Sequence, residues 1–106
     1  MLQKKEMIEK FSNLIHQNEL VLVDFYAEWC GPCKTMSPIL QEAKGVLKDA
    51  VRIIKINVDQ YQDLANEFSV RGVPTLILFK QGKMLWRQSG VVSSRDLVSI
   101  IQSHFN

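Results

Sequence analysis

The sequence is poor in cysteine, with only two among 106 residues. Small secreted domains that cannot build a sufficient core are usually held together by several disulfides, so this chain is not of that type. With 46% hydrophobic residues, it has the length and the apolar content to bury a core without such help. We therefore interpret residues 1–106 as one domain, in which the cysteine pair must be explained by chemistry or by metal binding.

The sequence also lacks long apolar runs and blocks of like charge. No stretch approaches the roughly 20 apolar residues of a membrane span, and Lys4 and Lys5 are not followed by an apolar run of signal-peptide length. The 13 basic and 11 acidic residues leave a net charge of only +2, spread along the chain. These absences predict a cytoplasmic protein that has neither a membrane nor a nucleic acid as its partner, although a mature secreted form without its signal would have the same features.

Hydrophobic periodicity predicts strands that alternate with helices in the first two thirds of the chain. Near-continuous apolar runs at 20–27 and 51–58 are typical of strands that are buried on both faces. The helical spacing of apolar residues predicts one helix ending near Gln17 and a second running from the cysteine motif to about Lys48. A short third helix follows Asp59, which we expect to be its N-cap. The pattern indicates an α/β protein.

The last third of the sequence predicts a β-hairpin and a closing helix. The segments 75–80 and 83–88 are strand-like, and Gly82 between them suits a tight turn. Ser93 has the position of an N-cap in a capping box, and His104 falls on the inward face of the helix that follows. We expect one mixed sheet of four or five strands with helices on both faces, and a reactive loop at the carboxyl end of a strand.

The two cysteines, Cys30 and Cys33, are separated by Gly31 and Pro32 at the start of the second predicted helix. A zinc site needs four ligands, and neither histidine lies in a ligand-spaced motif near the pair, so we expect no metal. A purely structural disulfide would stabilise the fold weakly, because it closes so small a loop. A redox role explains each position: the helix N-terminus favours the Cys30 thiolate, and Pro32 fits the first turn and holds Cys33 close enough to resolve a mixed disulfide.

Three segments, VDFYAEWCGPCK, KINVDQ and RGVPTLILF, resemble the signature segments of the thioredoxin family, and the resemblance continues through nearly the whole chain. It implies the thioredoxin fold and a protein that reduces disulfides in other proteins by dithiol–disulfide exchange. Members of this family bind no cofactor, and an NADPH-dependent thioredoxin reductase restores their dithiol. The resemblance therefore implies a redox-active Cys30–Cys33 disulfide, with thioredoxin reductase and disulfide-bearing client proteins as the partners of a monomer.

The resemblance assigns roles to residues around the pair. Asp24, inside an apolar strand, matches the buried acid that exchanges a proton with Cys33, and desolvation there would raise its pKa. Lys55 matches a lysine that lies near this acid, although an exposed lysine on a strand face is almost as good an interpretation. Pro74 matches a cis proline that faces the cysteines, and Val73 matches the residue whose backbone pairs with the client peptide.

The resemblance also implies a flat, mostly apolar docking surface for client proteins, although each member alone could be ordinary core or turn. Its members in this sequence are Trp29, Gly31, Pro32, Val58, Gly72, Val73, Pro74 and Gly90. Outside this surface, Trp86 is expected only to pack. Two features depart from the family: Tyr26 replaces a second tryptophan, and the usual first strand is missing or reduced to a few residues around Leu2.

Two rival functions remain open on the sequence alone. An oxidase or isomerase of disulfides would share the chemistry, but such proteins usually carry a histidine in place of Pro32, which stabilises the reduced thiolate and raises the reduction potential. A binding module would use the same shape as a subunit of a larger assembly, and it would keep its role after both cysteines were replaced by serine. The residues between the cysteines favour the reductase.

Overall fold

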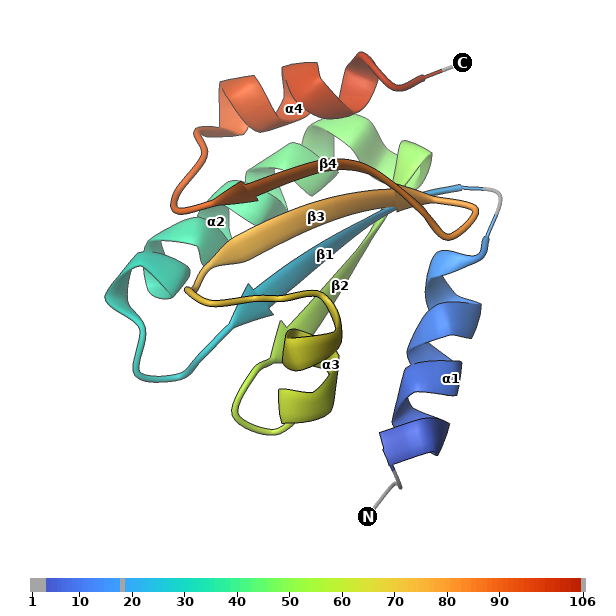
Figure 1. Ribbon diagram of the computed structural model, residues 1–106. Helices are drawn as coiled ribbons and strands as arrows, with labels where there is room; N and C mark the ends of the chain where they lie inside the picture. The colour runs from blue at the N-terminus through green and yellow to red at the C-terminus, as the bar shows by residue number, and fades with distance from the viewer. Residues whose placement is uncertain (1–3, 18, 106) are drawn as a thin grey trace.

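The computed structural model describes residues 4–17 and 19–105, which form a four-stranded mixed sheet with helices on both faces (Figure 1). The strands are β1 (Leu20–Tyr26), β2 (Val51–Asn57), β3 (Thr75–Lys80) and β4 (Lys83–Ser89), in the spatial order β2-β1-β3-β4. β1 pairs parallel with β2 and antiparallel with β3, and β3 and β4 form an antiparallel hairpin. The predicted α/β architecture is confirmed. The few residues around Leu2, to which the family's first strand was expected to be reduced if it is not missing, lie outside the described residues.

In the part of the chain that the structure describes, four helices cover the sheet, two on each face. They are α1 (Lys4–Ile15), α2 (Gly31–Leu47), α3 (Gln62–Glu67) and α4 (Ser94–Gln102), and a 3-10 turn, η1 (Lys48–Ala50), joins α2 to β2. Figure 1 shows α2 and α4 along one face and α1 and α3 on the other. Within the described ranges, no helix is long and apolar enough to cross a membrane.

The strand β1 divides its side chains between two hydrophobic cores. Leu22 packs with residues of α2 and α4, whereas Val21, Val23 and Phe25 pack with residues of α1 and α3. Because successive side chains of a strand point to opposite faces, Asp24 lies on the same face as Leu22. The strand thus places its one carboxylate beneath α2, the helix that begins at the cysteine motif.

The turn between β3 and β4 fastens the C-terminal end of α1 to the sheet. Gln81 and Gly82 have φ values of 52° and 80°, as the central residues of a type I′ hairpin require. The Gly82 N–H donates to the carbonyl of Ile15 at 2.8 Å, and the Gln81 N–H donates to the carbonyl of Gln17 at 3.1 Å. A β-carbon at Gly82 would overlap the His16 ring, so this close approach requires glycine.

The start of α3 differs from the sequence prediction, because Asp59 does not cap it. The helix begins at Gln62, and Tyr61 occupies the N-cap position without a capping side-chain bond. The carboxamide oxygen of Asn57 instead accepts the backbone N–H of Asp59 at 2.9 Å. An asparagine at the end of β2 thus organises this turn, and the Asp59 carboxylate has a different partner, described below.

The two ends of α4 compare differently with the prediction. Ser93 is the N-cap, as predicted, and its hydroxyl accepts the backbone N–H of Asp96 at 3.1 Å. The helix ends at Gln102, so the prediction that His104 lies on its inward face is wrong. The helical spacing of Leu97 and Ile101 predicts an inward position at 104, but the helix ends before it reaches that residue.

Candidate redox site

The cysteine motif lies where β1 ends and α2 begins. Cys30 is the N-cap residue of α2, with extended backbone, and its Sγ accepts the backbone N–H of Cys33 at 3.1 Å. Gly31 and Pro32 are exposed in the first turn, where a proline removes no helical hydrogen bond. The Cys30 sulfur therefore lies where unpaired N–H groups and the helix dipole stabilise negative charge.

Cys30 and Cys33 are joined in a disulfide, with their Cα atoms 5.3 Å apart. The exposed fractions of the two residues are 4% and 6%, so exposure does not distinguish an attacking sulfur from a resolving one. Their positions on the helix do, because Cys30 is at the cap and Cys33 is inside the first turn. The residues that pack around the pair are Tyr26, Ala27, Val58 and Val73.

The loop before β3 approaches the disulfide from across the site. The Val73–Pro74 peptide bond is cis, as the resemblance implied, and the carbonyl oxygen of Val73 lies 3.5 Å from Cys30 Sγ. The carbonyl of Pro74 accepts the N–H of Gly90 at 2.9 Å. This bond ties the end of the loop to the residue that follows β4, so Val73 is held beside the sulfur.

Trp29 is 71% exposed next to the disulfide, and a hydrogen bond fixes its ring. Its indole N–H donates to the carboxylate of Asp59 at 2.9 Å. A hollow of about 100 Å³ lies beside the ring; its lining residues are Trp29, Val58, Val70, Arg71, Gly72 and Val73. Four members of the predicted docking surface thus share one hollow, and the others, including Gly90, lie outside its lining.

Asp24 is 1% exposed, and within the described part of the chain its Oδ1 has no hydrogen-bond partner. Burial raises the pKa of Asp24 to about 6, and the positive charge of Lys55 opposes this rise in part. The two residues are partners in the parallel register of β1 and β2. Asp24 therefore titrates close to neutral pH, where a carboxyl group can both accept and release a proton.

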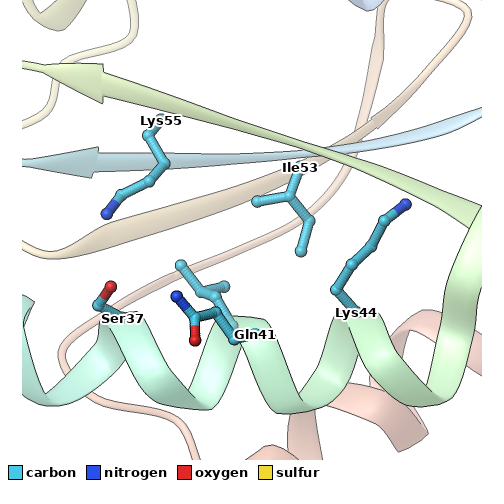
Figure 2. A pocket seen from close by; sticks show the side chains of 6 residues that line it. Ser37, Gln41, Lys44, Ile53 and Lys55 are labelled. Carbon is cyan, nitrogen blue, oxygen red and sulfur yellow. The ribbon is translucent and has the colours of Figure 1, made fainter.

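Lys55 is exposed on β2, with its Nζ 4.8 Å from the centre of the Tyr26 ring. It lines two hollows that also share Ser37. One, of about 200 Å³, reaches Cys33, and the other, of about 330 Å³, runs between α2 and β2 as far as Lys44. Figure 2 shows Lys55 and Lys44 toward opposite ends of this second groove, with Ser37 on the α2 side. The lysine is thus exposed and also acts on the buried acid.

The other polar and aromatic residues singled out from the sequence lie away from the disulfide. His16 packs over the hairpin turn at Gly82, at the opposite end of β3 from Pro74. Trp86 packs against the core formed with α2 and α4, as expected. In the described ranges, no three histidine, cysteine, aspartate or glutamate side chains are grouped so that they can hold a metal ion.

Sequence reasoning missed two residues that hold the loops of the site. Asp59 was interpreted as a helix cap, whereas its carboxylate holds Trp29. Arg87 on β4 was not singled out, although its guanidinium donates to the carbonyls of Phe68 and Ser69 at the end of α3. No sequence signal distinguishes either residue, because their partners are 18 to 30 positions away in the chain.

Comparisons with known proteins agree with this geometry. The thioredoxin family profile matches residues 3–103. Chloroplastic thioredoxin Y2 of Arabidopsis thaliana is 43% identical over 94% of this chain and 60% of its own length, and a thioredoxin-like protein of Synechocystis is 38% identical over 93% and 94%. The structure of mitochondrial thioredoxin 3 of Saccharomyces cerevisiae, in its oxidised form, superposes with a TM-score of 0.81 at 38% identity, covering 91% of this chain and 89% of that chain.

The relatives contradict the predicted cytoplasmic location. Three of them, two from Arabidopsis thaliana and one from Oryza sativa, are named chloroplastic and are 39–43% identical to this chain. The chain spans about 60% of the length of these relatives. The prediction was wrong because a missing apolar run argues only against a secretory signal, whereas plastid-targeting segments are rich in serine and arginine instead.

Proposed function

The chain belongs to the thioredoxin family, and on this premise we propose that it reduces disulfide bonds in other proteins by exchange through Cys30 and Cys33. The observation that carries the proposal is the position of the Cys30 sulfur. It lies at the N-terminus of α2, bonded to Cys33 and 3.5 Å from the carbonyl of Val73. This position combines a group that stabilises a thiolate with a backbone edge that can receive a peptide.

In the first half of the reaction, the Cys30 thiolate of the reduced protein attacks one sulfur of a client disulfide. A bond between Cys30 and that sulfur forms as the client disulfide breaks, and the second client sulfur leaves as a thiolate that takes up a proton. The client backbone pairs with Val73 by strand addition, and the hollow beside Trp29 receives an apolar client side chain.

In the second half, Cys33 resolves the mixed disulfide. Asp24, buried beneath α2 with its pKa raised to about 6, accepts the Cys33 proton, and the Cys33 thiolate attacks Cys30. The Cys30–Cys33 bond forms and the first client sulfur leaves as a thiolate, which is then protonated. The client thus gains two electrons from the two cysteines and two protons from solvent, and solvent in turn receives the protons that Cys30 and Cys33 gave up. The hollow lined by Cys33 and Lys55 admits solvent as far as the resolving cysteine, whose proton Asp24 accepts.

The disulfide form described above is the oxidised end of this cycle. We propose that an NADPH-dependent thioredoxin reductase supplies the electrons that restore the dithiol, as the family resemblance implies. Residues 1–106 would act as a single domain and as a monomer, because one copy carries both sulfurs, the buried acid and the docking loop. The exchange itself uses no bound cofactor and no metal.

Insulin reduction driven by NADPH and a thioredoxin reductase tests the proposal, with the wild type compared with Cys30→Ser and Cys33→Ser. We expect both variants to lose turnover, and only Cys33→Ser to accumulate an intermolecular adduct, because its Cys30 attacks but is never displaced. An adduct in Cys30→Ser alone would reverse the assigned order of attack.

Two outcomes would favour the rival functions. A biological role that survives replacement of both cysteines by serine would indicate a binding module. A measured reduction potential well above a glutathione poise of about −240 mV would indicate an oxidase or isomerase instead of a reductase.

A further inference from the structure

The helix α3 ends in a turn that contains a strained serine. The Ser69 N–H donates to the carbonyl of Asn66 at 3.0 Å, and the Val70 N–H donates to the carbonyl of Ala65 at 2.8 Å, which together make a Schellman motif. Ser69 has a φ of 52°. Glycine is the usual residue at this position, because a β-carbon costs about 1–2 kcal/mol in the left-handed region. A serine here requires stabilisation from elsewhere.

Arg87, half-buried on β4, supplies this stabilisation. Its guanidinium donates from Nη1 to the carbonyl of Phe68 and from Nη2 to the carbonyl of Ser69, the second bond measuring 2.9 Å. These carbonyls lie at the C-terminus of α3, where the helix leaves acceptors without intrahelical partners and its dipole favours a cation. The planar fork of an arginine reaches both acceptors at once, which a lysine ammonium cannot do with the same geometry.

The two bonds from Arg87 to the carbonyls of Phe68 and Ser69 are called the clamp below. The turn that they hold leads directly into the loop that faces the disulfide. Residues 70–73 follow it and line the hollow beside Trp29. The far end of the loop is held by the bond from the Gly90 N–H to the carbonyl of Pro74, and the Thr75 hydroxyl donates to the carbonyl of Gly72 at 2.6 Å. Arg87 and Gly90, three residues apart, therefore anchor the two ends of one loop.

We propose that Arg87 is a positioning residue, which holds loop 69–74 in the shape that a client peptide requires. The inference rests on the proposed reductase function and adds to it a determinant of client affinity. Both of these bonds go to backbone carbonyls at the end of α3 and neither reaches a cysteine, so the exchange chemistry of the two cysteines does not depend on them. Without the clamp, Ser69 relaxes toward negative φ, and a client must order the loop when it binds.

The test compares Arg87→Ala and Arg87→Lys with Arg95→Ala, which removes the same charge from an exposed position on α4. In insulin reduction, we expect Arg87→Ala to raise KM by about fivefold to tenfold with kcat within about twofold of the wild type, because only binding is weakened. The KM of Arg87→Lys should fall between those of the wild type and Arg87→Ala, and Arg95→Ala should change neither KM nor kcat. The rate at which dithiothreitol opens the Cys30–Cys33 disulfide should be unchanged throughout, because so small a reductant does not use the loop.

A second substitution keeps the test decisive if Arg87→Ala folds poorly. Arg87→Ala should also lower the amide exchange protection of residues 70–73. Ser69→Gly, added to Arg87→Ala, removes the backbone strain without restoring the two hydrogen bonds of Arg87. We expect the double variant to recover at least half of the KM defect and of the lost exchange protection. An unchanged KM in Arg87→Ala, or a lower kcat at constant KM, would overturn the inference. Failure of the proposed function itself would look different, because the wild type would then not reduce insulin although dithiothreitol still opened its disulfide.

Discussion

At the residue scale, Asp24 combines an exposed fraction of 1% with a carboxyl pKa near 6. Burial removes the carboxylate from water and raises the pKa, since the charged form loses its hydration. Lys55 opposes this rise only in part, because its side chain is exposed and its field is screened by solvent. The buried acid is therefore half ionised close to pH 6, which is the property that the proposed proton exchange with Cys33 uses.

Replacement of Asp24 by asparagine should change how stability depends on pH. A raised pKa in the folded state means that the folded protein binds the proton more tightly than the unfolded chain does, so the free energy of unfolding falls as pH rises from 3.8 to about 6 and is then constant. This difference corresponds to about 3 kcal/mol. The asparagine variant lacks this fall. In denaturant unfolding of the oxidised proteins, the free energy of unfolding of Asp24→Asn minus that of the wild type should therefore increase by about 2–3 kcal/mol from pH 4 to pH 7.

The same substitution should slow insulin reduction by about tenfold or more at pH 7, because Cys33 loses its proton acceptor. Asp49→Asn, at an exposed position on η1, is the matched control and should leave both the pH dependence and the turnover unchanged. Unfolding curves that stay parallel across the pH range, or an unchanged turnover, would contradict the role given to Asp24.

At the element scale, the sequence predicted the strands and helices wherever one physical pattern dominated. The run that became β1 is buried along nearly its whole length, as its continuous apolar residues predicted. The same prediction was wrong for β2, which lies at the edge of the described sheet and exposes Arg52 and Lys55. The pair Gln81–Gly82 suited a hairpin turn, and both residues adopt positive φ. Ser93 was recognisable as a cap because its partner N–H is only three residues away.

Features that depend on distant residues were not predictable in this way. The cap at Asp59 was predicted from residue type, but the Asp59 carboxylate accepts the indole N–H of Trp29, which is 30 positions away in the chain. Ser69 carries no glycine signal for its positive φ, and its stabilising partner Arg87 is 18 residues away. In the site, the cysteines, Asp24 and Val73 follow from the sequence resemblance, whereas the bond from Trp29 to Asp59 requires the folded chain.

Two glycines on different elements test how the β3–β4 turn holds the C-terminal end of α1. Gly82→Ala should lower the free energy of unfolding by about 1–2 kcal/mol, because φ is +80° and the new β-carbon meets the His16 ring. Gly45→Ala, inside α2 with open space around it, should instead raise it by about 0.5–1 kcal/mol. Thermal unfolding of both variants measures the contrast.

The His16→Ala background separates the two causes at the turn. The loss caused by Gly82→Ala should become smaller there, because the overlap with the ring is gone and only the backbone strain remains. Equal losses in both backgrounds would show that the His16 ring does not restrict this turn.

At the scale of the whole molecule, a cluster of phenylalanine rings joins α1, the sheet and the end of α3. The Phe11 ring lies edge-on to Phe68 at 5.3 Å and to Phe79 at 6.1 Å, and Phe68 also contacts Phe25 at 6.2 Å. Such tilted and edge-to-face pairs add to the burial of the rings themselves. Phe68 is also the residue whose carbonyl Arg87 binds, so the turn before the docking loop is held by the core on one side and by β4 on the other.

Within the described ranges, β2 pairs with β1 alone and is an edge strand. Its outer edge, here called the rim, therefore presents unpaired backbone groups to which another strand can bind. Arg52 and Lys55 are exposed along this rim and, three positions apart, stand on opposite faces of it. Two molecules that meet rim to rim bring these cations together, and their repulsion keeps the molecules dispersed. The colloidal behaviour of the protein should therefore depend on salt: light scattering should show association near 1 M NaCl, where the Debye length is about 3 Å, and at low salt only when Arg52 and Lys55 are both replaced by glutamine. A particle size that ignores both salt and these substitutions would mean that something other than charge guards the rim.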